Sequence, residues 1–362
     1  MWPNRSLIDV IGTQLPIIQA PMAGASGPEM TIGVCEAGGL GSLPCAMLDT
    51  GEIYGQVAAI RSRTDKPFNL NFFCHEKPQL TAASNDLWAQ TLAPYYAEFG
   101  VAPPDGSSAT GRMPFDETTC EVIEECQPAV VSFHFGLPEE SLLARVKATG
   151  CVVMCSATTV EEALCLEQNG CDAIIAQGCE AGGHRGMFLT SSVETQAGTM
   201  ALVPQIVDNV QVPVIAAGAI ADGRGIAAAF ALGAAGVQMG TAFLFTPEAL
   251  ITDLHRAALR NAADDHTALT NIFSGRPARG LMNRAMREIG PISDRAPAFP
   301  TAGAALAPLK KEAENQGLAD FSSLWSGQAA GLGRELSSQE LTTMMAEEAK
   351  QRLKDLSVDK SL

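Results

Sequence analysis

Eight short apolar segments alternate with segments of helical spacing, and this pattern predicts an α/β protein with a (β/α)8, or TIM, barrel. The alternation indicates a parallel sheet, and the count of eight favours a closed barrel over an open doubly wound sheet. No three-glycine fingerprint follows the first strand, which weakens the dinucleotide-binding Rossmann alternative. The strands are expected at residues 17–19, 40–44, 68–73, 129–133, 151–155, 173–177, 212–217 and 236–241.

Two stretches depart from the barrel rhythm. We expect a barrel over residues 1–245, with a rim insertion at about 75–118 that holds one helix at 85–99. Residues 246–362 are predicted to form a helical cap, a C-terminal extension packed on the barrel. Its first helix is expected to begin at Pro247 behind the N-cap residue Thr246, with further helices at 304–316 and 338–353.

Composition excludes several classes of function. The formal net charge is -16 and Lys and Arg form no cluster, which argues against binding to nucleic acid or to anionic membranes. No apolar run reaches the ~20 residues that span a bilayer. The ten cysteines contain no CxxC pair and no secretory signal precedes them, so a cytoplasmic protein with reduced thiols is expected. The five histidines are too scattered for a metal site, so none is predicted.

The loop after the sixth expected strand is the candidate active site. It reads Gly-Cys-Glu-Ala-Gly-Gly-His-Arg-Gly over residues 178–186, at the barrel end where such folds place their chemistry. A neutral imidazole can accept a carbon-bound proton near pH 7, so His184 is the candidate catalytic residue. Arg185 is a candidate charge partner in the substrate pocket, with a solvated arginine as the alternative.

The other histidines are weighed by position. His134 ends the fourth strand, and it either lines the substrate pocket or closes that strand structurally. Ser274 is a weak candidate for the site. The remaining histidines, His75, His255 and His266, are expected on the surface.

Two glycine-bearing turns, at 218–223 and at Gly240-Thr241, follow the seventh and eighth strands, where barrels of this kind bind phosphate. The same rim of the barrel is expected to carry the backbone groups of residues 21–23 and the side-chain amides of Asn71, Gln177 and Gln238.

Taken together, the motifs resemble those of the nitronate monooxygenase family, formerly called 2-nitropropane dioxygenases. The resemblance runs over about residues 14–245 and rests on 19–24, Asn71, 178–186, 217–223 and 238–241, while 131–136 and 274–280 resemble its class I branch. It implies that His184 is the catalytic histidine and that FMN lies across the barrel mouth. The candidate FMN-binding residues are Pro21, Met22, Ala23, Asn71, Gln177, Gly182, Gly183, Gly218, Gln238, Met239, Gly240 and Thr241.

The resemblance implies oxidation of alkyl nitronates such as propionate 3-nitronate with O2, giving carbonyl compounds and nitrite. In some members the histidine first takes the α-proton of a neutral nitroalkane. An FMN-dependent NAD(P)H reductase of quinones or enoyl thioesters is the alternative, because such reductases share a similar loop. A third possibility is a barrel that binds flavin or a phosphorylated ligand without catalysis.

A monomer or homodimer is expected. One departure from the family concerns residues 299–307, which lack the Tyr and Lys that several members carry after the extended linker at 291–300. If those residues help to select the substrate, selectivity differs in this chain.

Overall fold

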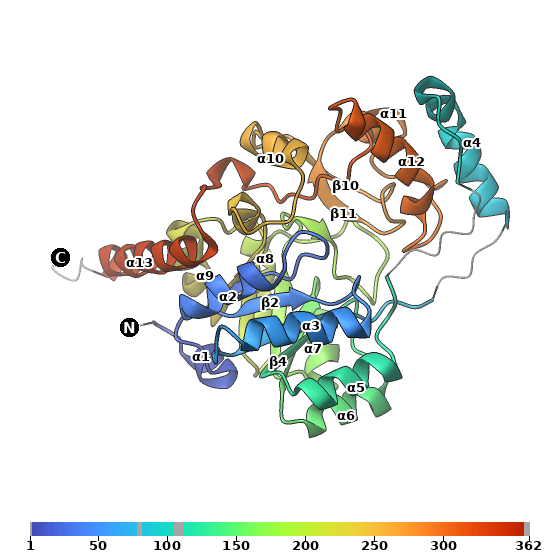
Figure 1. Cartoon of the computed structure of the whole chain (residues 1–362). Coiled ribbons are helices and arrows are strands. Elements are labelled where there is room, and N and C mark those ends of the chain that lie inside the picture. Colours follow the sequence, from blue (N-terminus) through green and yellow to red (C-terminus); the bar gives the residue numbers. More distant parts are fainter. Residues whose placement is uncertain (1, 78–81, 105–111, 358–362) are drawn as a thin grey trace.

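The computed structural model describes residues 2–77, 82–104 and 112–357 (Figure 1). Within them, eight parallel strands form one sheet in the order β1-β9-β8-β6-β5-β4-β3-β2. A parallel bridge between Ile18 and Leu40 joins the two edge strands, so the sheet closes. The predicted (β/α)8 barrel is confirmed. The strands are β1 (Ile17–Gln19), β2 (Gly41–Pro44), β3 (Phe68–Phe73), β4 (Val130–His134), β5 (Val152–Ala157), β6 (Ala173–Gln177), β8 (Val214–Ala217) and β9 (Gly236–Met239).

Helices follow the strands, and several begin at a side-chain cap that the sequence supplies. Asp49, Asp116, Thr159 and Asp222 each accept a hydrogen bond from a backbone N–H of the first turn that they precede. The helices around the barrel are α2 (Pro28–Glu36), α3 (Thr50–Arg61), α5 (Glu117–Cys126), α6 (Glu140–Ala148), α7 (Val160–Gln168), α8 (Thr199–Val207) and α9 (Gly223–Ala231). Among the described residues, no helix combines the length and the apolar character needed to cross a bilayer.

The barrel interior changes character along its axis. Its amino-terminal end is filled by apolar side chains, including Leu7 and Ile11 of the N-terminal helix α1 (Ser6–Ile11), a helix that the sequence pattern did not predict. Toward the carboxyl end the filling is polar: the Asn69 amide donates to the hydroxyls of Ser42 (3.0 Å) and Ser132 (2.8 Å). Polar groups therefore lie directly under the barrel mouth.

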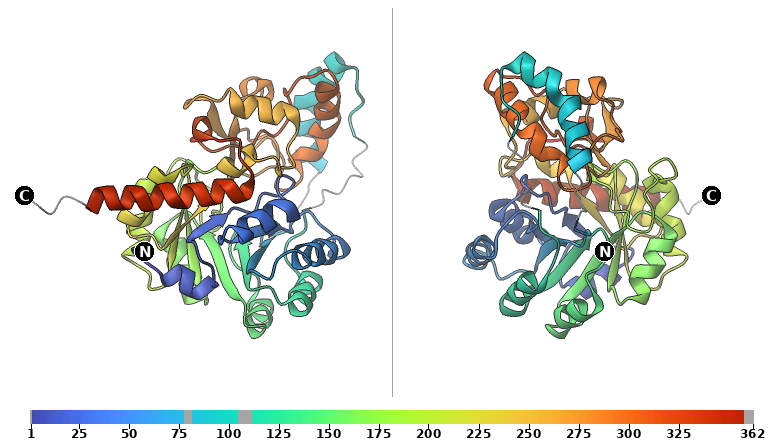
Figure 2. Two further views of the ribbon diagram at one scale, coloured as in Figure 1. Left: turned by 60° about the vertical axis from the view of Figure 1, so that its left-hand side comes forward. Right: turned by 90° about the vertical axis from the view of Figure 1, so that its right-hand side faces the viewer.

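A second layer lies over the carboxyl ends of the strands, and we call it the cap layer (Figure 2). It consists of α4 (Ala82–Phe99) and residues 246–337, which follow the short 3-10 helix η1 (Thr241–Phe245). The elements of residues 246–337 are α10 (Asp253–Arg260), β10 (Thr267–Thr270), β11 (Ala278–Leu281), α11 (Arg284–Glu288), α12 (Ala302–Asn315) and η2 (Ala330–Leu332). Trp88 of α4 donates to the Ala302 carbonyl (3.1 Å), and Tyr96 donates to the Ala305 carbonyl (2.6 Å). The rim insertion thus packs with the C-terminal segment.

Two expectations for this layer were wrong or incomplete. No helix begins at Pro247; Thr246 donates to the Phe243 carbonyl (2.9 Å), and the first α-helix starts at Asp253 behind the N-cap Thr252. The layer is also not purely helical, because β10, β11 and the two-residue strand β7 (Gly183–His184) form an antiparallel sheet.

The last helix, α13 (Ser338–Ser357), leaves the cap layer and runs along the outside of the barrel against α9 and α2 (Figure 2). Its Leu341, Met345 and Ala349 are buried in the same core as the barrel helices. We propose that α13 belongs to the barrel as its eighth helix, so that residues 246–337 are an insertion between the eighth strand and its helix.

Candidate active site

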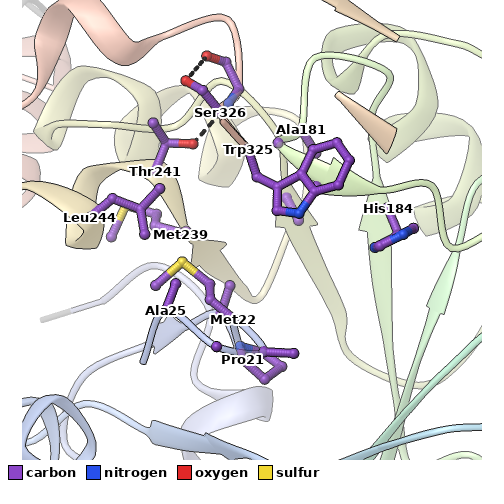
Figure 3. A pocket seen from close by; sticks show the side chains of 18 of the residues that line it. Pro21, Met22, Ala25, Ala181, His184, Met239, Thr241, Leu244, Trp325 and Ser326 are labelled. Carbon is purple, nitrogen blue, oxygen red and sulfur yellow. Dashed lines mark hydrogen bonds between the residues drawn. The ribbon is translucent and has the colours of Figure 1, made fainter. Parts of the chain in front are cut away.

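A cavity of about 510 Å³ lies between the barrel mouth and the cap layer (Figure 3). It is lined by the loops that follow β1, β6, β8 and β9, by residues of strands β3, β4, β5 and β6, and by residues 322–327 of the cap layer. All twelve candidate cofactor positions line it, and so do His134 and His184. The structure therefore brings the predicted residues together around one cavity. Which of them contact a cofactor stays a prediction.

His184 is held by the cap layer as well as by the barrel. Its strand β7 pairs with β11, with Ala278 opposite His184 and Arg279 opposite Gly183. Gly183 has a φ of +71°, a left-handed conformation that favours glycine, so the glycine before the histidine lets the loop turn into this strand. The His184 Nε2 atom lies 2.8 Å from the Ser274 hydroxyl oxygen, so the weak candidate Ser274 is a direct partner of the histidine.

Aromatic rings surround the His184 imidazole. Its centroid lies 5.3 Å from that of Phe299, 5.4 Å from that of Trp325 and 6.0 Å from that of Phe135. Phe299 comes from the segment at 299–307, which contains neither Tyr nor Lys, and its apolar ring occupies this side of the histidine.

The electrostatic surroundings keep His184 neutral. Burial lowers its pKa well below 6.5, and the positive charges of Arg112 and Arg276 act in the same direction, as do His134 and His75. Arg112 lines the cavity and comes from the end of the rim insertion. No motif in the sequence pointed to it.

His134 supports the loop that carries His184. Its Nε2 atom lies 3.2 Å from the His184 carbonyl oxygen, which can only accept, so Nε2 donates there and Nδ1 accepts from the Ser156 hydroxyl at 2.9 Å. Burial, with Arg276 as the largest charge contribution, lowers the pKa of His134 to about 3. His134 therefore both lines the cavity and closes its strand structurally.

Arg185 neither lines the cavity nor is exposed to solvent, the two positions expected for it. Its side chain is fully buried and is not part of the cavity wall. The guanidinium donates to the carbonyls of Gly178 (2.6 Å) and Gln177 (2.7 Å) and to the Gln196 side chain (2.8 Å). In an extended segment, neighbouring side chains point to opposite faces, so Arg185 points away from the side that His184 faces. It is a structural residue that closes its own loop.

Two histidines expected on the surface are buried, while His266 is exposed as predicted. His75 packs edge-on against Phe299 with a centroid distance of 4.8 Å. His255 donates from Nε2 to the Trp325 carbonyl (3.1 Å). Burial lowers the pKa of each to about 4, with Arg276 adding to the effect at His75. Contacts with the cap layer bury both residues. These contacts join segments that are distant in the sequence, so no local pattern predicted the burial.

The glycine-bearing turns meet at the opposite side of the cavity. Gly218 has a φ of +125° and Ala219 a φ of +53°, and a Cβ at Gly218 would lie 2.5 Å from the Thr199 hydroxyl. The Glu180 carboxylate accepts from the Thr199 backbone N–H (2.8 Å), so Glu180 fixes the loop against the start of α8. Only a glycine fits at position 218.

Two polar side chains at this side of the cavity, Gln238 and Thr241, differ in their hydrogen bonding. The Gln238 side-chain oxygen Oε1 is buried and has no hydrogen-bond partner among the described residues, although Gln238 lines the cavity. Thr241 accepts from the Gly327 backbone N–H (2.9 Å), which ties the cap layer to the barrel (Figure 3). A buried acceptor without a partner is costly, so a bound group with an N–H donor fits this position. In the described part of the chain, no group of three or more His, Cys, Asp or Glu residues is arranged to hold a metal ion.

The comparisons with known proteins agree on one family. The family model for nitronate monooxygenase matches residues 4–348. The nitronate monooxygenase of Paraburkholderia phytofirmans is 41% identical over 356 residues, covering 98% of this chain and 97% of that protein. That of Pseudomonas aeruginosa is 42% identical over 342 residues, covering 94% and 97%.

Two solved structures resemble this one over nearly their whole length. The nitroalkane oxidase of Streptomyces ansochromogenes has a TM-score of 0.87 at 38% identity, covering 97% of this chain and 99% of that chain. FabK of Thermotoga maritima has a TM-score of 0.73 at 27% identity, covering 99% of both chains.

Proposed function

This chain belongs to the nitronate monooxygenase family, and from that premise we propose that it is a flavin-dependent enzyme that oxidises nitronates with O2. The observation that carries the proposal is the convergence of His184, Gln238 and the two glycine-bearing turns on one cavity. The products expected are a carbonyl compound and nitrite.

We infer that the flavin is FMN, held by the twelve predicted positions. Backbone N–H groups of the turns at 218–221 and 240–241 suit a phosphate, and the unpartnered Gln238 oxygen suits an N–H of the flavin ring. Asn71 and Gln177 bring further amide groups to the same cavity. These residues would hold the flavin, which would supply the redox chemistry between the nitronate and O2.

The protein's own residues would bind and shield the substrate. The rings of Phe299 and Trp325 pack against His184, and Trp325 also lines the cavity, so the histidine has apolar surroundings on this side. Arg112 brings a positive charge to the wall, which favours an anionic nitronate. Neutral His184 can accept a proton or a hydrogen bond from the bound substrate.

The test is the absorbance of the purified protein followed by an oxygen-electrode trace. We expect a yellow protein that releases FMN on denaturation and consumes O2 when propionate 3-nitronate or ethyl nitronate is added. His184→Ala is expected to keep the flavin and lose most turnover. Turnover no faster than the buffer reaction with every nitronate tried would refute the function.

The same sample tests the alternative, an NAD(P)H-dependent reductase of quinones or enoyl thioesters. Fast anaerobic bleaching of the flavin by NADH would favour the reductase. Retention of both flavin and activity by His184→Ala would favour a barrel in which this histidine is not catalytic.

We also propose that the enzyme works in the cytoplasm as a monomer or homodimer. All ten cysteines are free thiols, which suits a reducing compartment. Light scattering of the purified protein would measure its oligomeric state.

A further inference from the structure

The contact between Ser274 and His184 carries information about where the histidine holds its proton. Ser274 lies in the turn between β10 and β11 and is fully buried. Its hydroxyl oxygen lies 2.8 Å from His184 Nε2, 3.2 Å from the Arg276 carbonyl oxygen and 3.4 Å from the Arg276 backbone nitrogen. One hydroxyl thus has three polar neighbours.

The single proton of the Ser274 hydroxyl decides the direction of the hydrogen bonds around it. A serine hydroxyl has one proton to donate, and the Arg276 carbonyl can only accept. When the hydroxyl donates to that carbonyl, its lone pairs face two donors: the Arg276 backbone N–H and His184 Nε2. This arrangement satisfies all three neighbours of the buried hydroxyl, whereas donation to Nε2 would take the proton from the carbonyl. The network therefore assigns the His184 proton to Nε2.

The second ring nitrogen is then an acceptor on the cavity side. His184 lines the cavity, and Nδ1 has no hydrogen-bond partner in the described part of the chain. A lone pair at Nδ1 repels the oxygen atoms of an anionic nitronate but can accept a proton from a neutral C–H acid. The position of the ring on the pocket wall is visible in Figure 3.

We propose that Ser274 is a positioning residue that holds the His184 proton on Nε2, leaving Nδ1 free to deprotonate neutral nitroalkanes. This inference rests on the proposed function and specifies the form of the substrate. In the step, the α-C–H bond of the nitroalkane breaks and its proton moves to Nδ1. The electron pair stays on the substrate and spreads onto the nitro oxygens, giving the nitronate that is then oxidised.

The charges around the site suit this step. Transfer of the proton produces an imidazolium and an anion from two neutral groups. The imidazolium keeps its Nε2–H bond to Ser274, and the cavity residue Arg112 lies where it can stabilise the anion. The positive charges around the site disfavour the imidazolium, but they stabilise the nitronate anion that forms in the same step.

The kinetic test compares freshly dissolved nitroethane with ethyl nitronate in Ser274→Ala and Ser274→Thr. We expect Ser274→Ala to lower kcat/KM for nitroethane by up to about 100-fold, the size of loss that misplacing a catalytic group can cause. The value for ethyl nitronate, which needs no proton removal and is repelled by the Nδ1 lone pair, should not fall, so the ratio of the two values is the readout. Ser274→Thr keeps the hydroxyl and should restore nitroethane turnover. Ser338→Ala, which removes another fully buried hydroxyl far from His184, is the matched control.

A spectroscopic test reads the proton position without any turnover. Nitrogen-15 NMR of the histidine-labelled holoenzyme should show His184 protonated at Nε2 and unprotonated at Nδ1, and Ser274→Ala should mix the two tautomers. The signal is assigned by its loss in His184→Asn. Protonation at Nδ1 in the wild type would overturn the proposal.

The outcomes separate this inference from the function on which it rests. Turnover of ethyl nitronate without turnover of nitroethane would refute the inference and leave the proposed function intact. Equal losses on both substrates in Ser274→Ala would show a structural role only. Failure with every nitronate would refute the proposed function, while the NMR measurement would still decide the tautomer.

Discussion

Arg112 shows how a single side chain from outside the barrel shapes the site. It lies at the end of the rim insertion, lines the cavity, and is the largest charge contribution that lowers the pKa of His184. Its guanidinium carbon lies 5.8 Å from the centroid of the Phe299 ring, and burial lowers the pKa of the guanidinium. A partly desolvated cation next to a neutral histidine favours an anion in the cavity.

Replacing Arg112 with Met should therefore weaken the binding of anionic substrate. We expect the KM for ethyl nitronate to rise tenfold or more, because a hydrogen bond to a charged group is worth about 1.5–3 kcal/mol. Steady-state oxygen consumption measures this. Arg295→Met, at an exposed position outside the cavity wall, is the matched control. An unchanged KM in Arg112→Met would show that this cation does not contact the substrate.

At the scale of elements, the loop at 178–186 is held between the barrel and the cap layer. A Cβ at Gly182 would lie 2.5 Å from the Gly327 nitrogen and 2.7 Å from the Ser326 carbonyl carbon. These are backbone atoms of a segment that is itself bonded to Thr241, so they cannot move aside without opening the cavity.

Gly182→Ala is thus expected to lower the free energy of unfolding by about 1–3 kcal/mol through overpacking and to weaken flavin retention. Gly55→Ala, in helix α3, is the control, since a Cβ there meets no atom within 4 Å and Gly55 is not part of the cavity wall. Urea unfolding and flavin released on gel filtration measure the two effects. Equal flavin retention in both variants would contradict the role given to Gly182.

Helix α13 offers a second test at this scale, because its place in the fold is itself a proposal. Met345 is fully buried in the barrel core, and Glu347, two residues further along, is exposed. Met345→Ala should cost about 2–5 kcal/mol of stability, as large-to-small core changes do, whereas Glu347→Ala should change it by less than about 0.5 kcal/mol. Urea unfolding of the whole chain measures both. Similar effects in the two variants would show that α13 is not part of the cooperative barrel core.

What the sequence could predict depended on how local the signal was. Apolar runs ending at glycines or amides placed all eight barrel strands to within about two residues, because each run and its break lie close together in the chain. Strands β7, β10 and β11 were missed, since a two-residue strand such as Gly183–His184 exists only through its pairing with Ala278 and Arg279. The place of α13 likewise depends on contacts made more than a hundred residues away.

The same contrast holds for the site. The cavity-lining glycines and amides were predicted because they end strands, and strand ends share one rim. Arg185 was misread because its neighbour His184 faces the cavity, and adjacent residues of an extended segment face opposite ways. Arg112, Trp325 and Phe299 reach the site from the cap layer and its connections, where no strand-end rule applies.

For the whole molecule, the buried histidines predict a loss of stability in acid. The pKa is lowered to about 4 at His75 and His255 and to about 3 at His134, in each case chiefly by burial. In the unfolded chain their pKa is about 6.5. The unfolded state therefore binds more protons below pH 6.5, so the stabilisation is complete above that pH and is lost as the pH falls toward 4.

Each such histidine should cost roughly 2 kcal/mol between pH 7 and pH 5, a large part of the 5–15 kcal/mol that typically holds a domain together. His255→Gln tests this, because the amide can still donate to the Trp325 carbonyl but does not titrate. We expect its free energy of unfolding to fall less between pH 7 and pH 5 than that of the wild type, by about 2 kcal/mol. His266→Gln, at an exposed position, should follow the wild type. Urea titrations at the two pH values measure the difference, and a His255→Gln variant as acid-sensitive as the wild type would mean that the unfolding equilibrium does not depend on this buried ring.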